Sequence, residues 1–410
     1  MKLKKPLLFL VIMHLAIASI AQQQIGYCFE PGYRRVEIPF KRYNNLVIIP
    51  VTVKGQLTLN FVVDTGVQNT ILTDKVYGDI LQLEYDRNVI IRGPGEKDSV
   101  QVFVVDNIEM ALKGIVGKNI PLIVLDQDFL KLSNNLGSDV HGIIGYDLFK
   151  HFVVEFNYDD DKIVFHDPKR FNQRRYYKKI PIDIVGTKPY MDAHITQQNG
   201  VEADIKLMID TGASHGILLN PATSNDIFIP DKNLTAVLGS GLGGEIFGLV
   251  GRVGHLKIDK FGFNEVISFY PYDEHYGYGL RSGDRNGTIG GELLSSFNLI
   301  FNYHEKMLYL RKSREYNRKF EFDLCGIDIM SFGKDFEIIM VKSVREDSPA
   351  SEVGIMKGDI IEMINGKNTE TATLNYINAL IRSKPGKKIA LRIKRGERKF
   401  KVKFKLKRLI

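Results

Sequence analysis

The chain has 410 residues, of which 44% are hydrophobic and 25% are charged, so it is long enough for two or three globular domains. The net charge of +8 comes from the two ends, because residues 387–410 hold 12 Lys and Arg against one Glu and the N-terminal segment adds three Lys. The main body carries an acidic excess, which excludes a nucleic-acid-binding surface as its general property.

Residues 1–21 have the pattern of a secretory signal peptide. Three lysines precede an apolar stretch from Leu7 to Ile20, and the small residue Ala21 ends the segment. We expect cleavage after Ala21 and export to the periplasm, the cell surface or the medium. A retained membrane anchor is the alternative, but the apolar stretch of about 14 residues is shorter than the roughly 20 that span a bilayer. No later segment is apolar enough to predict a membrane span.

Cysteine and histidine usage predicts no cross-linked or metal-bound fold. Cys28 and Cys325 are the only two cysteines, so a disulfide framework is not expected even in an exported protein. The cysteines and the nine histidines show no metal-ligand spacing, and we expect neither a metal nor another cofactor.

Short apolar runs separated by turn residues dominate residues 35–165 and 180–311, which predicts two small all-β lobes. Basic stretches poor in aliphatic residues lie at 168–179 and 311–319 and are typical of linkers. We therefore expect domain boundaries near 174 and 317. The expected domains are a first lobe at 22–173, a second lobe at 174–316 and a C-terminal domain at 317–410.

A duplicated tripeptide is the most informative pattern in the chain. Asp64-Thr65-Gly66 closes one apolar run, and Asp210-Thr211-Gly212 closes another. A Gly-x-Ile-Gly or Gly-Ile-Ile-Gly element follows each triplet at a matching distance, and the sequence Phe-Asn-Tyr then recurs at 156–158 and 301–303. Three landmarks that share one period indicate a structural duplication.

The chemistry of the triplets depends on their being paired. Glycine in such a loop permits a close approach of backbone, and threonine can hydrogen-bond to the facing loop. Two loops brought together would place two carboxylates side by side, and like charges so close share one proton. One aspartate would then act as a base towards water and the other as an acid, which predicts amide hydrolysis without a covalent intermediate. Two unrelated Asx turns are the alternative, but they would not explain the shared period.

These residues resemble the aspartic proteases, the clan of retropepsins and pepsins, over residues 30–312. The resemblance implies a mainly β fold with two pseudo-symmetric barrel lobes, and an endopeptidase that acts on polypeptides. It implies a monomer, because one chain supplies both halves of the site. By the resemblance, Asp64 and Asp210 are the catalytic pair, Thr65 and Thr211 brace the two loops, and Gly66, Gly212 and Ser214 support them.

The match to this family is uneven between the two triplets. The second continues with Ala213-Ser214, as the family often does, whereas the first continues with Val67-Gln68. The missing hydroxyl would remove a hydrogen bond to the ionised aspartate, so we expect a raised apparent pKa and activity nearer to neutral than to acidic pH. The departure leaves a catalytically inactive peptide-binding protein of the envelope as the alternative function. A third alternative is an envelope scaffold in which the lobes are only structural, and this function accounts least well for the two Asp-Thr-Gly triplets.

Enzymes of this kind need a mobile hairpin over the cleft. Two glycine-rich stretches follow the triplets at comparable distances. The second stretch also spells Gly-x-Gly-x-x-Gly, the dinucleotide fingerprint, but residues 245–254 predict further strand and not the helix of a βαβ unit. The flap candidates are Gly93, Gly95, Gly239, Gly241, Gly243 and Gly244.

Residues 320–410 resemble a PDZ domain of the kind found on bacterial envelope proteases. The resemblance rests on the order of four segments: Ser348-Pro349-Ala350, Gly354-Ile355, Gly358–Ile361 and Ile364–Lys367. It implies an α+β domain in which a peptide adds as a strand beside a helix at 374–381. The loop Leu324, Cys325, Gly326 and Ile327 would hold the terminal carboxylate of a peptide or protein by backbone N–H groups. A domain that packs on the protease and binds nothing is the alternative.

Overall fold

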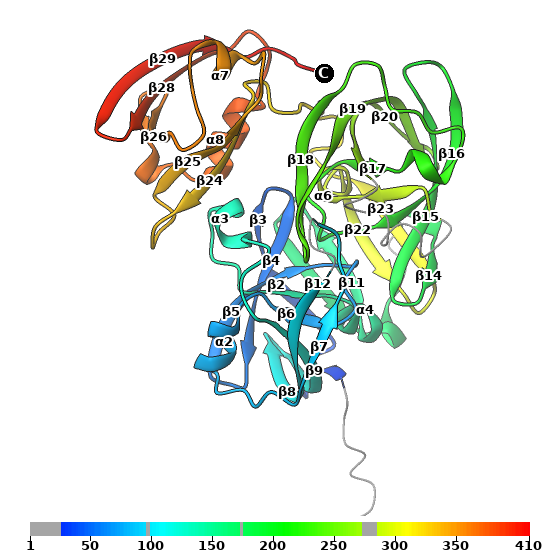
Figure 1. The fold of residues 1–410 in the computed structure, drawn as a ribbon. Coiled ribbons are helices and arrows are strands. Elements are labelled where there is room, and N and C mark those ends of the chain that lie inside the picture. The colour runs from blue at the N-terminus through cyan, green and yellow to red at the C-terminus, as the bar shows by residue number, and fades with distance from the viewer. Residues whose placement is uncertain (1–25, 96–98, 173–174, 273–284) are drawn as a thin grey trace, which may run out of the picture.

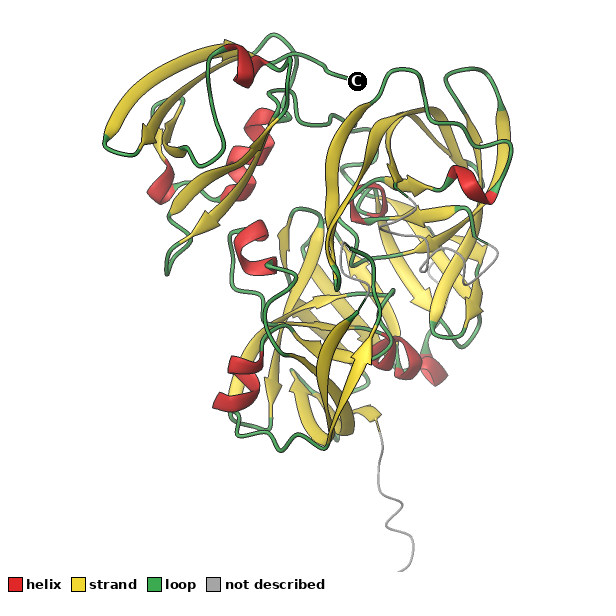
Figure 2. Ribbon diagram, in the orientation of Figure 1, coloured by secondary structure: helices red, strands yellow, loops and turns green. Residues whose placement is uncertain are grey.

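The computed structural model describes residues 26–95, 99–172, 175–272 and 285–410 (Figure 1). The signal peptide expected at 1–21 lies outside these residues. The fold is mainly β, as the sequence predicts, with four sheets and short helices (Figure 2). No helix in the described ranges is long and apolar enough to cross a membrane.

The first lobe is built on a nine-stranded sheet formed by the first third of the chain. Three short helices pack around it: α2 (Lys75–Ile80), α3 (Leu132–Leu136) and α4 (Tyr146–His151). Its strands are β1 (Gly26–Phe29), β3 (Lys41–Tyr43), β4 (Leu46–Val53), β5 (Leu57–Val63), β6 (Thr70–Leu72), β7 (Arg87–Ile91), β8 (Val100–Leu112), β9 (Ile115–Leu125) and β10 (Gly142–Ile144).

The second lobe is built on an eight-stranded sheet with the short helix α6 (Gly291–Leu294) beside it. Its strands are β14 (Asp183–Val185), β15 (Lys188–Thr196), β16 (Glu202–Ile209), β17 (Ile217–Leu219), β18 (Leu234–Gly241), β19 (Gly244–Ile258), β20 (Phe261–Pro271) and β21 (Gly287–Ile289).

The two lobes repeat the same strand pairings around their Asp triplets. In the first lobe β10 runs parallel to β5 and antiparallel to β6, and in the second β21 runs parallel to β16 and antiparallel to β17. The next pairings, β6 with β9 and β17 with β20, are parallel in both. The sequence duplication is therefore a duplication of architecture, which places each Gly-Ile element beside the strand that ends in its aspartate.

A six-stranded sheet joins the two halves of the chain, because β11 pairs with β22 in antiparallel register. The repeated Phe-Asn-Tyr sequence lies here, with Phe156 and Phe301 both fully buried and their rings 5.9 Å apart. The halves thus share one hydrophobic core. The strands are β2 (Arg35–Pro39), β11 (Val153–Asn157), β12 (Lys162–His166), β13 (Lys178–Pro181), β22 (Phe297–Asn302) and β23 (Met307–Lys312).

The C-terminal domain has its own core and a sheet in the order β24-β25-β26-β28-β29, so β24 is an edge strand. The helix α8 lies at 374–381 as expected, and the alternating basic tail forms β29 with Phe404 on its buried face. The elements are β24 (Ile327–Phe332), β25 (Ile338–Val344), α7 (Pro349–Glu352), β26 (Ile360–Ile364), β27 (Lys367–Asn368), α8 (Leu374–Ile381), β28 (Lys388–Arg395) and β29 (Arg398–Lys405).

Candidate active site

Each aspartate leaves the end of a buried strand and is anchored by its own backbone. The Asp64 N–H donates to the Ile144 carbonyl at 2.9 Å, and the Asp210 N–H donates to the Ile289 carbonyl at 3.0 Å. The acceptors belong to β10 and β21, the Gly-Ile strands whose spacing follows the triplets. This bond fixes the chain at the point where it turns from strand to loop.

Reciprocal hydrogen bonds of the two threonines lock the loops together. The Thr65 hydroxyl accepts from the Thr211 N–H at 3.0 Å and donates to the Ile209 carbonyl at 2.7 Å. The Thr211 hydroxyl accepts from the Thr65 N–H at 3.1 Å and donates to the Val63 carbonyl at 2.8 Å. Both threonines are buried, so these four bonds are shielded from water. The structure therefore places Thr65 and Thr211 where they brace one loop against the other.

The two glycines of the triplets face the carboxyl group of the opposite loop. A Cβ atom on Gly212 would lie 2.2 Å from Cγ of Asp64, and one on Gly66 would lie 3.1 Å from Cγ of Asp210. Each glycine also donates its N–H to the aspartate two residues before it, at 2.6 Å for Gly66 and 2.9 Å for Gly212. Glycine is needed here because the facing carboxyl occupies the space of a side chain.

Because each carboxyl group lies against the glycine of the opposite loop, the charges of Asp64 and Asp210 act on one another. Burial, then the charge of Asp210, raises the pKa of Asp64 well above its usual range. A proton shared by such a pair stays bound at pH values where an isolated aspartate has lost it. The pair therefore offers an acid and a base within one site.

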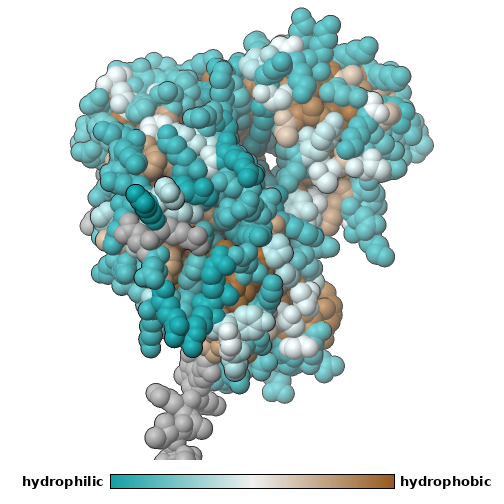
Figure 3. All heavy atoms as spheres, turned by 180° about the vertical axis from the view of Figure 1, so that it is seen from behind, coloured by the Kyte–Doolittle hydropathy of each residue, from teal (hydrophilic) through white to brown (hydrophobic). Residues whose placement is uncertain are grey.

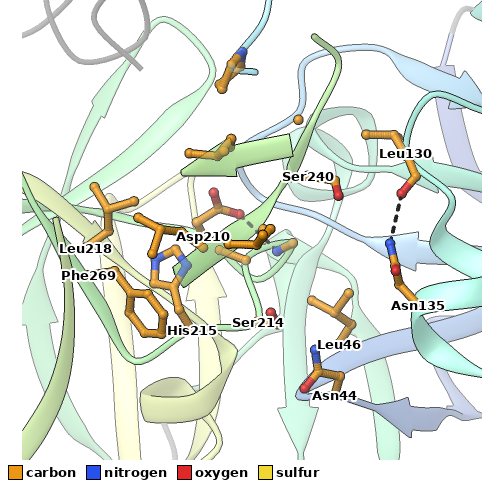
Figure 4. Close-up of a pocket in the computed structure, with 18 of the residues that line it drawn as sticks. Asn44, Leu46, Leu130, Asn135, Asp210, Ser214, His215, Leu218, Ser240 and Phe269 are labelled. Carbon is orange, nitrogen blue, oxygen red and sulfur yellow. Dashed lines mark hydrogen bonds between the residues drawn. The ribbon is translucent and has the colours of Figure 1, made fainter. Parts of the chain in front are cut away.

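The carboxyl pair lies in a cleft of about 1170 Å³ that both lobes and the C-terminal domain line. In the space-filling view the surface is hollowed between the C-terminal domain and the lobes, with apolar side chains inside the hollow (Figure 3). In the close-up, His215 lies between Asp210 and the ring of Phe269, and Leu218 lies to one side of His215 (Figure 4). The cleft has an apolar wall beside Asp210.

The two glycine-rich stretches meet across the cleft. The Gly243 N–H donates to the Pro94 carbonyl at 2.9 Å, and a Cβ on Gly241 would lie 2.2 Å from that oxygen. Gly95 abuts the backbone of Gly243, and Gly93 abuts Leu242. The second stretch, with Gly239 before it and Gly244 after it, forms the tip of the β18–β19 hairpin and not a strand-to-helix turn. This position suits a cover over the carboxyl pair, which stays a prediction.

Ser214 lies beside the dyad but does not act through its hydroxyl in this structure. Its carbonyl accepts from the Asn45 side chain at 3.0 Å, which ties the second loop to the first lobe. Between described residues, no hydrogen bond joins the Ser214 hydroxyl to Asp210. The support expected from Ser214 therefore comes from its backbone.

Three residues of the site were missed by the sequence reasoning. Burial lowers the pKa of His215 to about 4, and its Nε2 atom is buried without a partner. Glu292 also lines the cleft, and burial raises its pKa. The Tyr303 hydroxyl is buried with no hydrogen-bond partner among the described residues, and burial followed by the charge of Asp64 raises its pKa well above the usual value. Tyr303 ends the second Phe-Asn-Tyr sequence, which was a signal of its importance.

The predicted carboxylate-binding loop of the C-terminal domain already contains a carboxylate. The Cys325 N–H donates to Oδ1 of Asp323 and the Gly326 N–H to Oδ2, both at 2.8 Å. The Leu324 N–H donates to the carbonyl of Ile381 at 3.1 Å, and Ile327 begins β24. Burial raises the pKa of the Cys325 thiol to about 12, so it is unreactive as a nucleophile.

Among the residues that the structure describes, no three His, Cys, Asp or Glu side chains gather as a set that could bind a metal ion. The two cysteines, Cys28 and Cys325, are both free thiols.

Two protein families match this chain, one in the two lobes and the other in the C-terminal domain. The aspartyl protease family matches twice, at residues 49–148 and 194–292, and the PDZ domain family matches residues 340–395. Each aspartyl protease match contains one Asp-Thr-Gly triplet and its Gly-Ile strand. The chain therefore carries an aspartyl protease domain and a PDZ domain.

Similar proteins are named probable CtpA-like serine protease. One from Staphylococcus haemolyticus is 32% identical over 94 residues, or 23% of this chain and 19% of that protein. One from Staphylococcus aureus is 25% identical over 151 residues, or 36% of this chain and 29% of that protein. One from Staphylococcus epidermidis is 28% identical over 102 residues, or 25% of this chain and 21% of that protein. The chain spans less than a third of the length of these relatives.

Proposed function

We propose that this protein is an exported aspartic endopeptidase of two pseudo-symmetric, retropepsin-like lobes. The observation that carries the proposal is that Asp64 and Asp210 line one cleft, each carboxyl facing the glycine of the other loop, and that the four reciprocal bonds of Thr65 and Thr211 fix the two loops. Two isolated Asx turns would need neither the facing glycines nor the crossed threonines. The aspartyl protease matches to both halves support the same function.

The chemistry follows from one proton shared by two carboxyl groups. The ionised member of the pair accepts a proton from a water molecule as that water attacks the scissile carbonyl carbon. The protonated member donates its proton to the carbonyl oxygen. As the C–N bond breaks, the amine nitrogen takes the proton that the first aspartate accepted from water, and a hydroxyl of the tetrahedral intermediate returns a proton to the second aspartate. The raised pKa of Asp64 fits a pair that keeps one shared proton at the start. No covalent enzyme intermediate forms.

A serine-type mechanism is the rival, because the similar proteins carry that name. A serine nucleophile needs a base such as His or Lys within hydrogen-bond reach. Across the described ranges, no hydrogen bond joins a serine hydroxyl to a histidine or lysine side chain. The hydroxyls that directly follow the two aspartates in sequence, those of Thr65 and Thr211, donate to backbone carbonyls and are buried. These contacts favour the aspartic mechanism.

A catalytically silent peptide-binding protein is the second candidate. The sequence Val67-Gln68 is the observation that favours it, because the first loop lacks the small residue and hydroxyl of the second. In the fold, Val67 packs against Gly145, where a Cβ would lie 2.6 Å from Cγ1 of Val67. Val67 thus packs on the strand that holds the first loop, and the Asp64 carboxyl still faces Gly212 of the second loop, which supports a working pair.

The test is hydrolysis of an unfolded protein by the chain from residue 22 onward, between pH 3 and 8, with products sequenced by mass spectrometry. Asp64→Asn and Asp210→Asn should each abolish cleavage. Asp192→Asn is the matched control, because Asp192 lies exposed on β15 and should leave cleavage unchanged. Inhibition by a serine-directed phosphonate, or cleavage that survives both dyad variants, would refute the aspartic mechanism. Binding without cleavage at any pH would support the second candidate.

A further inference from the structure

The carboxylate-binding loop of the PDZ domain is filled from within the chain. Both oxygens of Asp323 accept backbone N–H groups of that loop, from Cys325 and Gly326, at 2.8 Å each. Asp323 is only 4% exposed and forms an ion pair with Arg345. Its carboxylate uses two N–H donors that the terminal carboxylate of a peptide would need.

Displacing Asp323 would carry a large penalty. Arg345 also contacts Asp328 at 3.2 Å and donates its backbone N–H to the Gly326 carbonyl at 2.8 Å. A free C-terminus entering this loop would meet a buried like charge and would leave Asp323 without its N–H partners. The loop is therefore built around an internal carboxylate and not around that of a ligand.

The far end of the peptide groove is covered by the first lobe. The Asn134 side chain donates to the Ser331 carbonyl at 2.8 Å, and the Ser331 hydroxyl donates to the Asn134 carbonyl at 3.0 Å. Gly137, just after α3, packs against Leu374 at the start of α8, where a Cβ would lie 2.8 Å from Cβ of Leu374. A strand added to β24 cannot extend past Ser331 in this arrangement.

The middle of the groove stays open and faces the catalytic cleft. Ile327 and Ile329 of β24 and Ile381 of α8 line the same cleft as Asp64 and Asp210. The Ser331 carbonyl points to the free edge of β24, so by the two-residue period of a strand the backbone groups of Ile329 face that edge too. The edge thus offers backbone pairing and apolar contact inside the cleft.

The groove is also tied to the hairpin over the dyad. Lys342 of β25 forms an ion pair with Glu245, the second residue of β19, next to the glycine-rich tip. Lys342 lines the cleft as well. A polypeptide in the groove would therefore lie next to the element that is placed to cover the carboxyl pair.

We infer that the PDZ groove binds an internal stretch of the polypeptide substrate, as an extension of the catalytic cleft, and does not select a free C-terminal carboxylate. The inference rests on the proposed function for the nature of the substrate. It follows from a filled carboxylate loop, a covered far end and an open middle that shares the cleft of Asp64 and Asp210.

The test measures binding to the full chain with Asp64→Asn, so that bound peptides stay intact. The probes are overlapping peptides of about 12 residues from an unfolded model protein, longer than a strand of typical length. Each peptide is made twice, with a C-terminal carboxylate and with a carboxamide. We expect the two forms to bind with affinities within about twofold of each other. A loss of about tenfold or more on amidation would overturn the inference.

Two variants locate the site. Ile329→Asp places a charge in the groove and should weaken both peptide forms by about tenfold or more. Ile338→Asp is the matched control, because Ile338 is 41% exposed on the neighbouring strand β25 and should change nothing. Unchanged binding by Ile329→Asp, or no binding of either form to the parent chain, would overturn the inference.

A third variant tests the role of Asp323. Asp323→Ala frees the N–H groups of Cys325 and Gly326 and removes one of the two carboxylate partners of Arg345, so we expect a new preference of about tenfold for the carboxylate form. Asp323→Asn keeps an oxygen acceptor in the loop and serves as the folded control. Binding in these assays does not depend on turnover, so a chain that binds but never cleaves would refute the proposed function and leave this inference standing.

Discussion

The two Asp-Thr-Gly loops have the same backbone contacts and different neighbours. In both, the aspartate N–H binds the carbonyl of a Gly-Ile strand, the threonine crosses to the other loop, and the glycine N–H binds the aspartate. Only the second loop carries a histidine five residues after its aspartate, and the Nε2 atom of this His215 is buried. The contacts that bring the two aspartates together are therefore the same in both loops. The residues around the two carboxyl groups differ, and the protonation of the pair depends on them.

The largest expected effect is the loss of activity when either carboxyl group is removed. Asp64→Asn and Asp210→Asn should each lower kcat by about 10³-fold or more, because the acid and the base act as a unit. The double variant should be no worse than either single one. Steady-state hydrolysis of a quenched peptide measures this, and additive losses would show that the two groups act independently.

The glycines offer a sharper comparison of the two loops. A Cβ on Gly212 would overlap Cγ of Asp64 at 2.2 Å, whereas one on Gly66 meets Cγ of Asp210 at 3.1 Å. We therefore expect Gly212→Ala to lower kcat by about 100-fold and Gly66→Ala by about tenfold, because small misplacements of reacting groups are costly. A larger loss of kcat for Gly66→Ala than for Gly212→Ala would contradict this expectation. It would mean that the flexibility of each loop, and not the space at its glycine, decides the effect.

Much of this site was predictable from the sequence because the chain repeats itself. The period that joins the triplets, the Gly-Ile strands and the Phe-Asn-Tyr sequences predicted which elements lie together, and the strand pairing of β5 with β10 and of β16 with β21 agrees. Helix α8 was predictable from its place in the PDZ-like order of segments. These predictions rest on local patterns and on the order of motifs.

The rest depended on contacts between segments with no shared pattern. Asp323 was not predicted in the PDZ loop, because an Asp two residues before a Cys-Gly pair has no signature beyond an ordinary turn. Asn134 and Ser331 are 197 residues apart, and only docking of the PDZ domain on α3 brings them together. His215 and Tyr303 became site residues through burial, which is a property of the packed chain.

The threonine bonds test the symmetric part of the comparison. Thr65→Val and Thr211→Val each remove two buried hydrogen bonds and leave an N–H and a carbonyl unpaired, so each should lower the free energy of unfolding by about 2–4 kcal/mol. Thr58→Val is the control, since the Thr58 hydroxyl meets that of Thr52 at an exposed position. Urea unfolding measures all three. Unequal losses in the free energy of unfolding for Thr65→Val and Thr211→Val would show that one threonine contributes more than the other to holding the loops together.

The pH dependence tests the asymmetric part. The pKa of Asp64 is raised in the folded chain, so between the unfolded and folded pKa values the native state binds more protons, and stability falls as pH rises through this window. Asp64→Asn should remove this loss and be more stable than the parent chain at pH 7. Activity should fall over the same window as the shared proton leaves. Thermal unfolding from pH 4 to 8, with Asp192→Asn as control, measures this, and an unchanged pH profile would contradict the shared proton.

The smallest expected effect compares the two repeated tyrosines. The Tyr303 hydroxyl is buried without a partner, whereas Tyr158 has Arg42 over its ring at 5.8 Å. Removing an unpaired buried hydroxyl relieves its desolvation, so Tyr303→Phe should raise the free energy of unfolding by about 1 kcal/mol. Tyr158→Phe should change it by less than about 0.5 kcal/mol. Urea unfolding separates these values. A loss of stability in Tyr303→Phe would mean that the hydroxyl has a bound partner in solution and that its burial is not a cost.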